Sequence, residues 1–206
     1  MVGKEDTKPR KLPRQQRSRE MVEAILEATA RVLVREGYER ATTNRVAEVA
    51  GVSVGSLYQY FPNKESLVAA LMGRHLEEMG EIYEREFAEL REAPLGIAVR
   101  GLISASVEAH AVRPELHKVF VEQVPRVGDL GRVAKVGKLI EEKLLDLLLR
   151  HRREVGREDL GLATFLILYG VESAIHAAVV ERPEYVEDGR LADELTVLVL
   201  GYLSSR

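Results

Sequence analysis

The chain has 206 residues, 46% of them hydrophobic, and a formal net charge of −3 at neutral pH. This length suffices for one large or two small domains with a buried core, so stability requires neither disulfides nor a metal. The chain contains no cysteine, which excludes disulfide frameworks, thiolate zinc sites and cysteine nucleophiles and fits a reducing cytoplasm.

The first residues, MVGKEDTKPRKLPRQQR, are basic but are not followed by an apolar segment, so we expect no cleaved signal peptide and a cytoplasmic protein. Residues 1–64 contain 12 Lys and Arg against 8 Asp and Glu, whereas residues 65–206 contain 18 against 25. This asymmetry predicts a flexible basic arm over residues 1–17 and a polyanionic partner at the N-terminal end. Charge alone supports a solvated, disordered tail equally well.

From residue 18 onward the apolar residues recur with helical period, and no stretch alternates like a half-buried strand. The sequence therefore predicts an all-α fold. The first helix is expected over residues 18–36, with Gly37 placed to end it. Further helices are expected at residues 44–50, 54–60, 64–91, 95–112, 115–123, 130–154, 159–181 and 189–204.

Two short helices joined by a tight turn follow the first helix. Thr42 or Thr43 can cap the first of them, and Gly51 can adopt the left-handed conformation that the turn needs. Ser53 can cap the second, and Asn63 can cap the long helix that comes next. This order predicts a helix-turn-helix, whose second helix enters the major groove of DNA.

The residue types around the second short helix suit DNA recognition. Small residues at its start allow close approach to the groove, and the Gln59 amide can bond a base edge. Hydroxyl and ammonium groups around it can contact phosphate. On the opposing interpretation, the two tyrosines pack a small core and Lys64 is a solvated charge. The candidate DNA contacts from the residues are Thr43, Val54, Gly55, Ser56, Tyr58, Gln59, Tyr60 and Lys64.

The segment GYERATTNRVAEVAGVSVGSLYQYFPNKESLVAAL, residues 37–71, resembles the DNA-binding signature of TetR-type regulators. The resemblance implies a three-helix DNA-binding domain over residues 18–63 and a helical ligand-binding and dimerisation domain over residues 64–206. It implies a homodimer, usually a repressor, that binds a palindromic double-stranded DNA operator and releases it when a small molecule binds. It implies the same DNA contacts, with Asn44 and Arg45 as further candidates, and a minor-groove role for the basic arm.

The C-terminal part contains a helix that is apolar on nearly all sides. Only Glu172 and His176 interrupt the run from Leu160 to Val180. A helix of this length and composition could also span a membrane, which is the alternative interpretation. A helix that packs on its own core and on a second subunit has the same composition, and we favour that interpretation. The resemblance implies that helices at 159–181 and 189–204 form a four-helix bundle across a twofold axis.

An effector pocket is expected among polar and aromatic residues scattered through the apolar helices. The effector, the operator sequence and the regulated genes are not predicted. A constitutive architectural DNA binder is the alternative function, and an enclosed apolar cavity with polar groups would favour sensing instead. The pocket candidates are Tyr83, Phe87, His110, Phe120, Gln123, Phe165, Tyr169, Glu172 and His176.

Two patterns suggest other chemistry but lack its context. Residues 51–55 match the G-x-S-x-G nucleophile elbow, which needs a preceding strand, whereas the segment before it is helical; we expect no enzyme activity. The five histidines suggest a metal sensor as another function. However, Pro114 should break the helix that would align His110 with His117. Ordinary packing is the expectation for the histidines, with no metal and no cofactor.

Overall fold

The computed structural model describes residues 16–123 and 130–205, and every regular element within these ranges is a helix. The all-α fold is thereby confirmed. Most of the basic arm lies outside the described residues. The chain forms two compact units. The described part of the N-terminal unit is residues 16–76, 115–123 and 130–132, and that of the C-terminal unit is residues 77–114 and 133–205.

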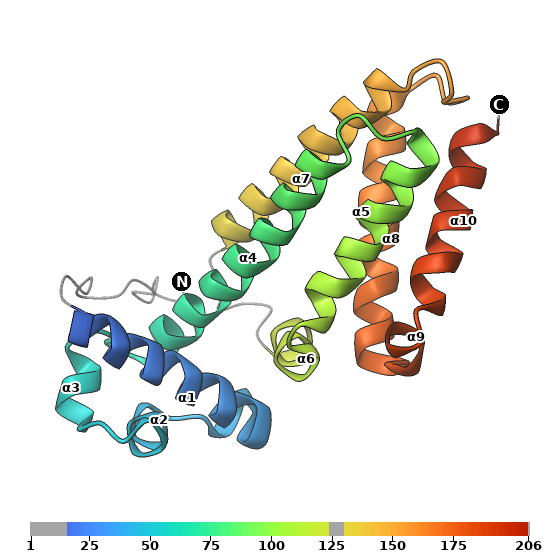
Figure 1. Ribbon diagram of the computed structural model, residues 1–206. Helices are drawn as coiled ribbons and strands as arrows, with labels where there is room; N and C mark the ends of the chain where they lie inside the picture. The colour runs from blue at the N-terminus through green and yellow to red at the C-terminus, as the bar shows by residue number, and fades with distance from the viewer. Residues whose placement is uncertain (1–15, 124–129, 206) are drawn as a thin grey trace, which may run out of the picture. The chain divides into compact units, whose positions relative to one another are not determined.

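The N-terminal unit is built on a long first helix with two short helices after it (Figure 1). At Gly37, φ is 77° and ψ is 165°, which interrupts the first helix where the sequence predicts its end. The apolar stripe of that helix, including Ile25 and Leu33, is buried in the core of the unit. The helices of this unit are α1 (Gln16–Arg40), α2 (Thr43–Ala50), α3 (Val54–Tyr58), the first turns of α4 (Lys64–Glu89) and most of α6 (Pro114–Gln123).

The N-terminal unit extends beyond the predicted boundary at residues 63/64. Leu67, Val68 and Leu71 of α4 are at most 1% exposed and belong to the same core cluster as the residues of α1, α2 and α3. Burying this face holds the first turns of α4 in the N-terminal unit. The division between the units therefore falls after Leu76, inside α4.

The C-terminal unit contains the rest of α4 and five further helices. Among these, α5, α8 and α10 pack on one another (Figure 1). Their bounds are α5 (Leu95–Ala111), α7 (Leu130–Arg150), α8 (Leu160–Glu181), α9 (Glu184–Glu187) and α10 (Arg190–Ser204). All but the four-residue α9 were predicted, each within a few residues of its bounds.

One face of α8 is apolar and exposed. The Asp159 carboxylate caps this helix by accepting a hydrogen bond from the Leu162 amide at 2.9 Å. By length and composition α8 could cross a membrane, and the structure buries 39% of its apolar stretch. The large apolar residues exposed on α8 and α10 are Leu162, Phe165, Leu166, Tyr169, Val197 and Leu198.

Candidate functional site

Local hydrogen bonds shape the pair of short helices α2 and α3. The Thr42 hydroxyl caps α2 by accepting from the Arg45 amide at 3.2 Å, so Thr42 rather than Thr43 is the cap. Gly51 has a φ of 68°, and its amide donates to the carbonyls of Ala47 and Glu48. The Ser53 hydroxyl then caps α3. Each expected element of the helix-turn-helix is therefore present.

Helix α3 presents a small, accessible surface. Val54, Gly55 and Tyr58 are exposed, while Leu57 on the opposite side is fully buried. Gln59 directly follows the helix and is also exposed. The predicted contact Ser56 is half-buried, with its hydroxyl 2.8 Å from that of Ser53. Together these residues leave one face of α3 open to a binding partner.

The predicted contacts on α2 lie beside this face. The Thr43 hydroxyl is 3.1 Å from the Tyr58 hydroxyl, which joins the start of α2 to α3. Asn44 is exposed in the first turn of α2. Arg45 is engaged within the protein, with ion pairs of 2.7 Å to Glu36 and 2.8 Å to Glu48. Of these three residues, Thr43 and Asn44 are therefore more accessible to a binding partner than Arg45.

The side chains of Tyr60 and Lys64 make contacts within the protein. Tyr60 is only 6% exposed and belongs to the core cluster of the N-terminal unit. The Lys64 ammonium donates to the Tyr38 carbonyl at 3.0 Å and lies 4.0 Å from the centre of the Tyr38 ring. The structure therefore places Tyr60 inside the core instead of on the open face of α3.

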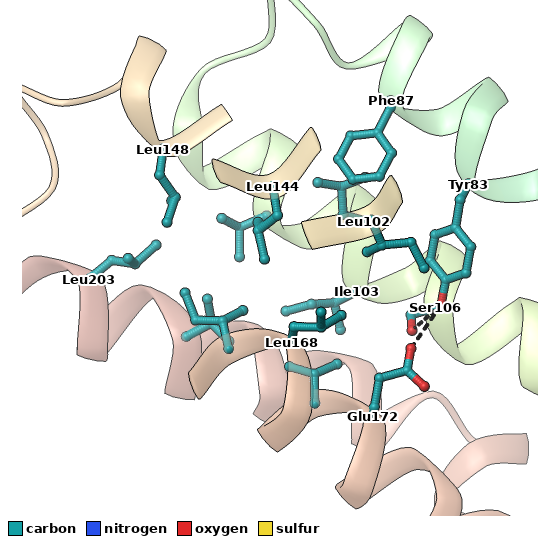
Figure 2. A pocket seen from close by; sticks show the side chains of 15 residues that line it. Tyr83, Phe87, Leu102, Ile103, Ser106, Leu144, Leu148, Leu168, Glu172 and Leu203 are labelled. Atoms are coloured by element: carbon teal, nitrogen blue, oxygen red, sulfur yellow. Dashed lines mark hydrogen bonds between the residues drawn. The ribbon is translucent and has the colours of Figure 1, made fainter. Parts of the chain in front are cut away.

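The C-terminal unit contains a cavity of about 560 Å³, counting its open mouth. Figure 2 shows apolar side chains around it, with Tyr83, Ser106 and Glu172 together on one side and Leu148 and Leu203 on the other. The lining residues are Tyr83 and Phe87 of α4, Val99, Leu102, Ile103 and Ser106 of α5, Ile140, Leu144 and Leu148 of α7, Ile167, Leu168, Val171 and Glu172 of α8, and Val199 and Leu203 of α10.

Hydrogen bonds link the polar residues of the cavity. The Tyr83 hydroxyl lies 2.7 Å from the Ser106 hydroxyl and donates to Oε1 of Glu172 at 3.2 Å (Figure 2). Burial, together with the Glu172 carboxylate, raises the pKa of Tyr83, so this hydroxyl keeps its proton. The cavity therefore combines a long apolar wall with one polar corner.

Two histidines contact Glu172. Its Oε2 lies 3.2 Å from Nε2 of His110 and 3.7 Å from Nε2 of His176. Burial raises the pKa of Glu172, but His110, His176 and Tyr83 together outweigh burial, and the net pKa lies below its ordinary value. Burial and the charge of His110 lower the pKa of His176 despite Glu172. At neutral pH this gives a carboxylate beside a neutral His176 imidazole.

The structure brings only part of the predicted pocket together. Tyr83, Phe87 and Glu172 line the cavity, and His110 and His176 contact Glu172.

The remaining candidates lie elsewhere. Phe120 belongs to the N-terminal core, with its ring 5.6 Å from that of His75. Phe165 and Tyr169 are exposed on α8, and the Gln123 side chain lies outside the described part.

Most lining residues were not singled out in the sequence. The aliphatic ones have the same helical spacing as core residues, so periodicity does not distinguish them. Ser106 carried a usable signal, because it is a polar residue within the apolar run of α5 and is only 5% exposed.

Comparison with known proteins gives two family matches. Residues 94–203 match the family described as "Tetracyclin repressor-like, C-terminal domain", and residues 25–71 match "Bacterial regulatory proteins, tetR family". An uncharacterised helix-turn-helix transcriptional regulator, YvkB of Bacillus subtilis, is 39% identical over 125 residues. That match covers 60% of this chain and 64% of the relative, so the chain spans less than two thirds of its length.

Solved structures share the fold. The fatty acid degradation regulator FadR of Bacillus halodurans has a TM-score of 0.71 at 23% identity, covering 90% of this chain and 97% of that one. Bacillus subtilis FadR, solved in complex with stearoyl-CoA, has a TM-score of 0.68 at 21% identity, covering 87% and 98%. With family matches to both its N-terminal and its C-terminal segments, this chain belongs to the TetR family of bacterial regulatory proteins.

Proposed function

We propose that the chain is a cytoplasmic DNA-binding transcriptional regulator, a repressor, that binds a palindromic operator as a homodimer and is released by a small-molecule effector. The observation that carries the proposal is the capped helix pair α2 and α3, whose Gly51 turn leaves one face of α3 exposed. In a helix-turn-helix the second helix enters the major groove while the first crosses the backbone.

The accessible residues that were predicted as DNA contacts have proposed roles. Val54 and Gly55 permit close approach to the groove floor, and the Gln59 amide bonds a base edge. Thr43 and Asn44 lie in the first turn of α2, where the backbone amides and the helix dipole favour phosphate. Tyr58 contacts phosphate through its hydroxyl. Tyr60 supports α3 by packing, and Ser56 supports it through its hydroxyl contact with Ser53. Arg45 holds the start of α2 through its ion pairs with Glu36 and Glu48, and Lys64 adds positive charge at the rim.

A homodimer accounts for the exposed apolar faces of α8 and α10. An isolated face with side chains such as Tyr169 and Leu198 more than half exposed costs free energy in water. Pairing α8 and α10 with the same helices of a second copy buries this face as a four-helix bundle. Twofold symmetry then matches two recognition helices to two half-sites, and a membrane is not needed to explain α8.

The cavity of the C-terminal unit is the proposed effector site. Its apolar wall with a few polar groups at one corner is the lining common for small-molecule sites. The fold likeness to FadR of Bacillus subtilis, solved with stearoyl-CoA, supports a ligand-binding role. Helix α4 belongs to both units and connects them covalently. A coupling of about 1–3 kcal/mol would change operator affinity about 5- to 150-fold, enough for a switch.

The test is selection of binding sites from random DNA duplexes by the purified protein. We expect a palindrome of two half-sites, and we expect Gln59→Ala to weaken or relax recognition by about 1–3 kcal/mol at the position it reads. Ser104→Ala, an exposed substitution on α5 in the C-terminal unit, is the control and should select the wild-type sequence. Enrichment of no sequence, with binding that only weakens as salt rises, would indicate an architectural DNA binder instead.

A further inference from the structure

Three electron-pair donors converge beside the cavity of the C-terminal unit. Glu172 and His176 are four residues apart on α8, so they lie on one face of that helix, and His110 reaches them from α5. The distance between the two histidine Nε2 atoms is 3.2 Å, and Oε2 of Glu172 lies 3.2 Å from one and 3.7 Å from the other. One imidazole nitrogen from each histidine therefore faces the same carboxylate oxygen.

The hydrogen bond on the far side of His110 fixes the ring. Its Nδ1 donates to the Ser106 carbonyl oxygen at 2.7 Å, and since a carbonyl only accepts, the proton is on Nδ1. This bond turns the other ring nitrogen, Nε2, toward Oε2 of Glu172 and Nε2 of His176.

The spacing fits a small divalent cation. Zinc binds imidazole nitrogen and carboxylate oxygen at about 2.0–2.2 Å in a tetrahedron, whose ligand atoms are then about 3.4 Å apart. The three distances of 3.2, 3.2 and 3.7 Å bracket this value. The outer partners are also those of a metal site, with a backbone carbonyl on Nδ1 of His110 and the Tyr83 hydroxyl on Oε1 of Glu172.

We propose that His110, Glu172 and His176 bind a divalent transition metal ion of the zinc type. Two imidazoles and one carboxylate are a ligand set for Zn²⁺, and three protein ligands leave a coordination position for water or for an oxygen or nitrogen atom of a small molecule. Because Glu172 also lines the cavity, the metal adjoins the space assigned above to the effector.

The proposed site differs from the sequence-based expectation of no metal. Its three residues come together because α5 packs on α8, which the spacing of His110 and His117 along the chain does not reveal.

The experiment uses the full chain, stripped with a chelator and titrated with Co²⁺. We expect the visible d–d absorption of tetrahedral Co²⁺ to saturate at one ion per chain and to disappear when Zn²⁺ is added. His176→Gln and Glu172→Gln each remove a ligand and should weaken Co²⁺ binding at least about 100-fold, while Tyr83→Phe, which removes an outer partner, should weaken it about 10-fold.

The matched control is a second histidine–glutamate pair. Nδ1 of His151 lies 2.8 Å from Oε1 of Glu154, and His151→Gln should leave the Co²⁺ titration unchanged. Circular dichroism checks that each variant folds, and the wild-type chain gives an independent readout, because bound Zn²⁺ should raise its thermal unfolding midpoint.

Wild-type protein without the absorption or the thermal shift would overturn the proposal, as would absorption that persists in both ligand variants. Operator binding is measured in a separate experiment, so the proposed metal site and the proposed regulatory function are tested independently of each other.

Discussion

Gly51 has the backbone conformation that the turn between α2 and α3 requires. Its φ of 68° is left-handed, and apart from the adjoining residues no described atom lies within 4 Å of a Cβ built there, so alanine would meet a conformational penalty rather than a clash. We expect Gly51→Ala to lower the free energy of unfolding by about 1–2 kcal/mol, measured by urea denaturation.

Gly80 provides the matched control for that substitution. It lies within helix α4, and apart from the adjoining residues and the nearby backbone of α4 a Cβ there meets no described atom within 4 Å. In a helix alanine is preferred to glycine, so Gly80→Ala should raise the free energy of unfolding by about 0.5–1 kcal/mol. Equal effects of the two substitutions would refute the assignment of a left-handed requirement to Gly51.

At the scale of elements, α4 depends on the cap at its start. The Asn63 side-chain oxygen accepts from the Ser66 amide at 2.8 Å, and the Ser66 hydroxyl donates back to the Asn63 carbonyl at 2.7 Å. Asn63→Ala should lower the free energy of unfolding by about 1 kcal/mol, seen as an earlier thermal transition. Asn44→Ala, at an exposed position in α2, should change it by less than about 0.5 kcal/mol.

The helices were predictable from sequence because their signals are local. Caps such as Ser53 and Asn63, the turn at Gly51 and the 3.6-residue apolar period all act within a few neighbouring residues. Helix α9 was missed because its four residues, Glu184–Glu187, are too few to show a period. Short helices of this kind are therefore visible only in the structure.

The sites were less predictable because they depend on contacts between distant segments. The exposed face of α3 follows from its caps and turn, but the burial of Tyr60 depends on packing with several helices. Likewise, nothing in the separate sequences of α5 and α8 indicates that His110 meets Glu172 and His176. Polar residues in apolar helices could be noted, but their partners could not.

At the scale of the whole molecule, the proposed dimer predicts where a charge is not tolerated. Leu198 on α10 is 64% exposed, and we expect Leu198→Glu to shift the protein toward monomer in sedimentation velocity experiments, because dimerisation would bury the new carboxylate. Leu149→Glu, at a leucine of α7 that is 56% exposed, should leave the sedimentation coefficient unchanged. Equal sedimentation of the Leu198 variant and wild type would contradict a dimer through α10.

The N-terminal core includes Leu116, Val119 and Phe120 of α6, which are separated from the rest of this core by residues 77–114 of the C-terminal unit. During translation, the ribosome must therefore add α6 before this core can close. At about 5–20 residues per second, the nascent helix-turn-helix waits for seconds after α3 is made. Throughout that interval the apolar face of α1 to α3 is open to chaperones, so the N-terminal unit cannot finish folding until more than half of the chain has been made.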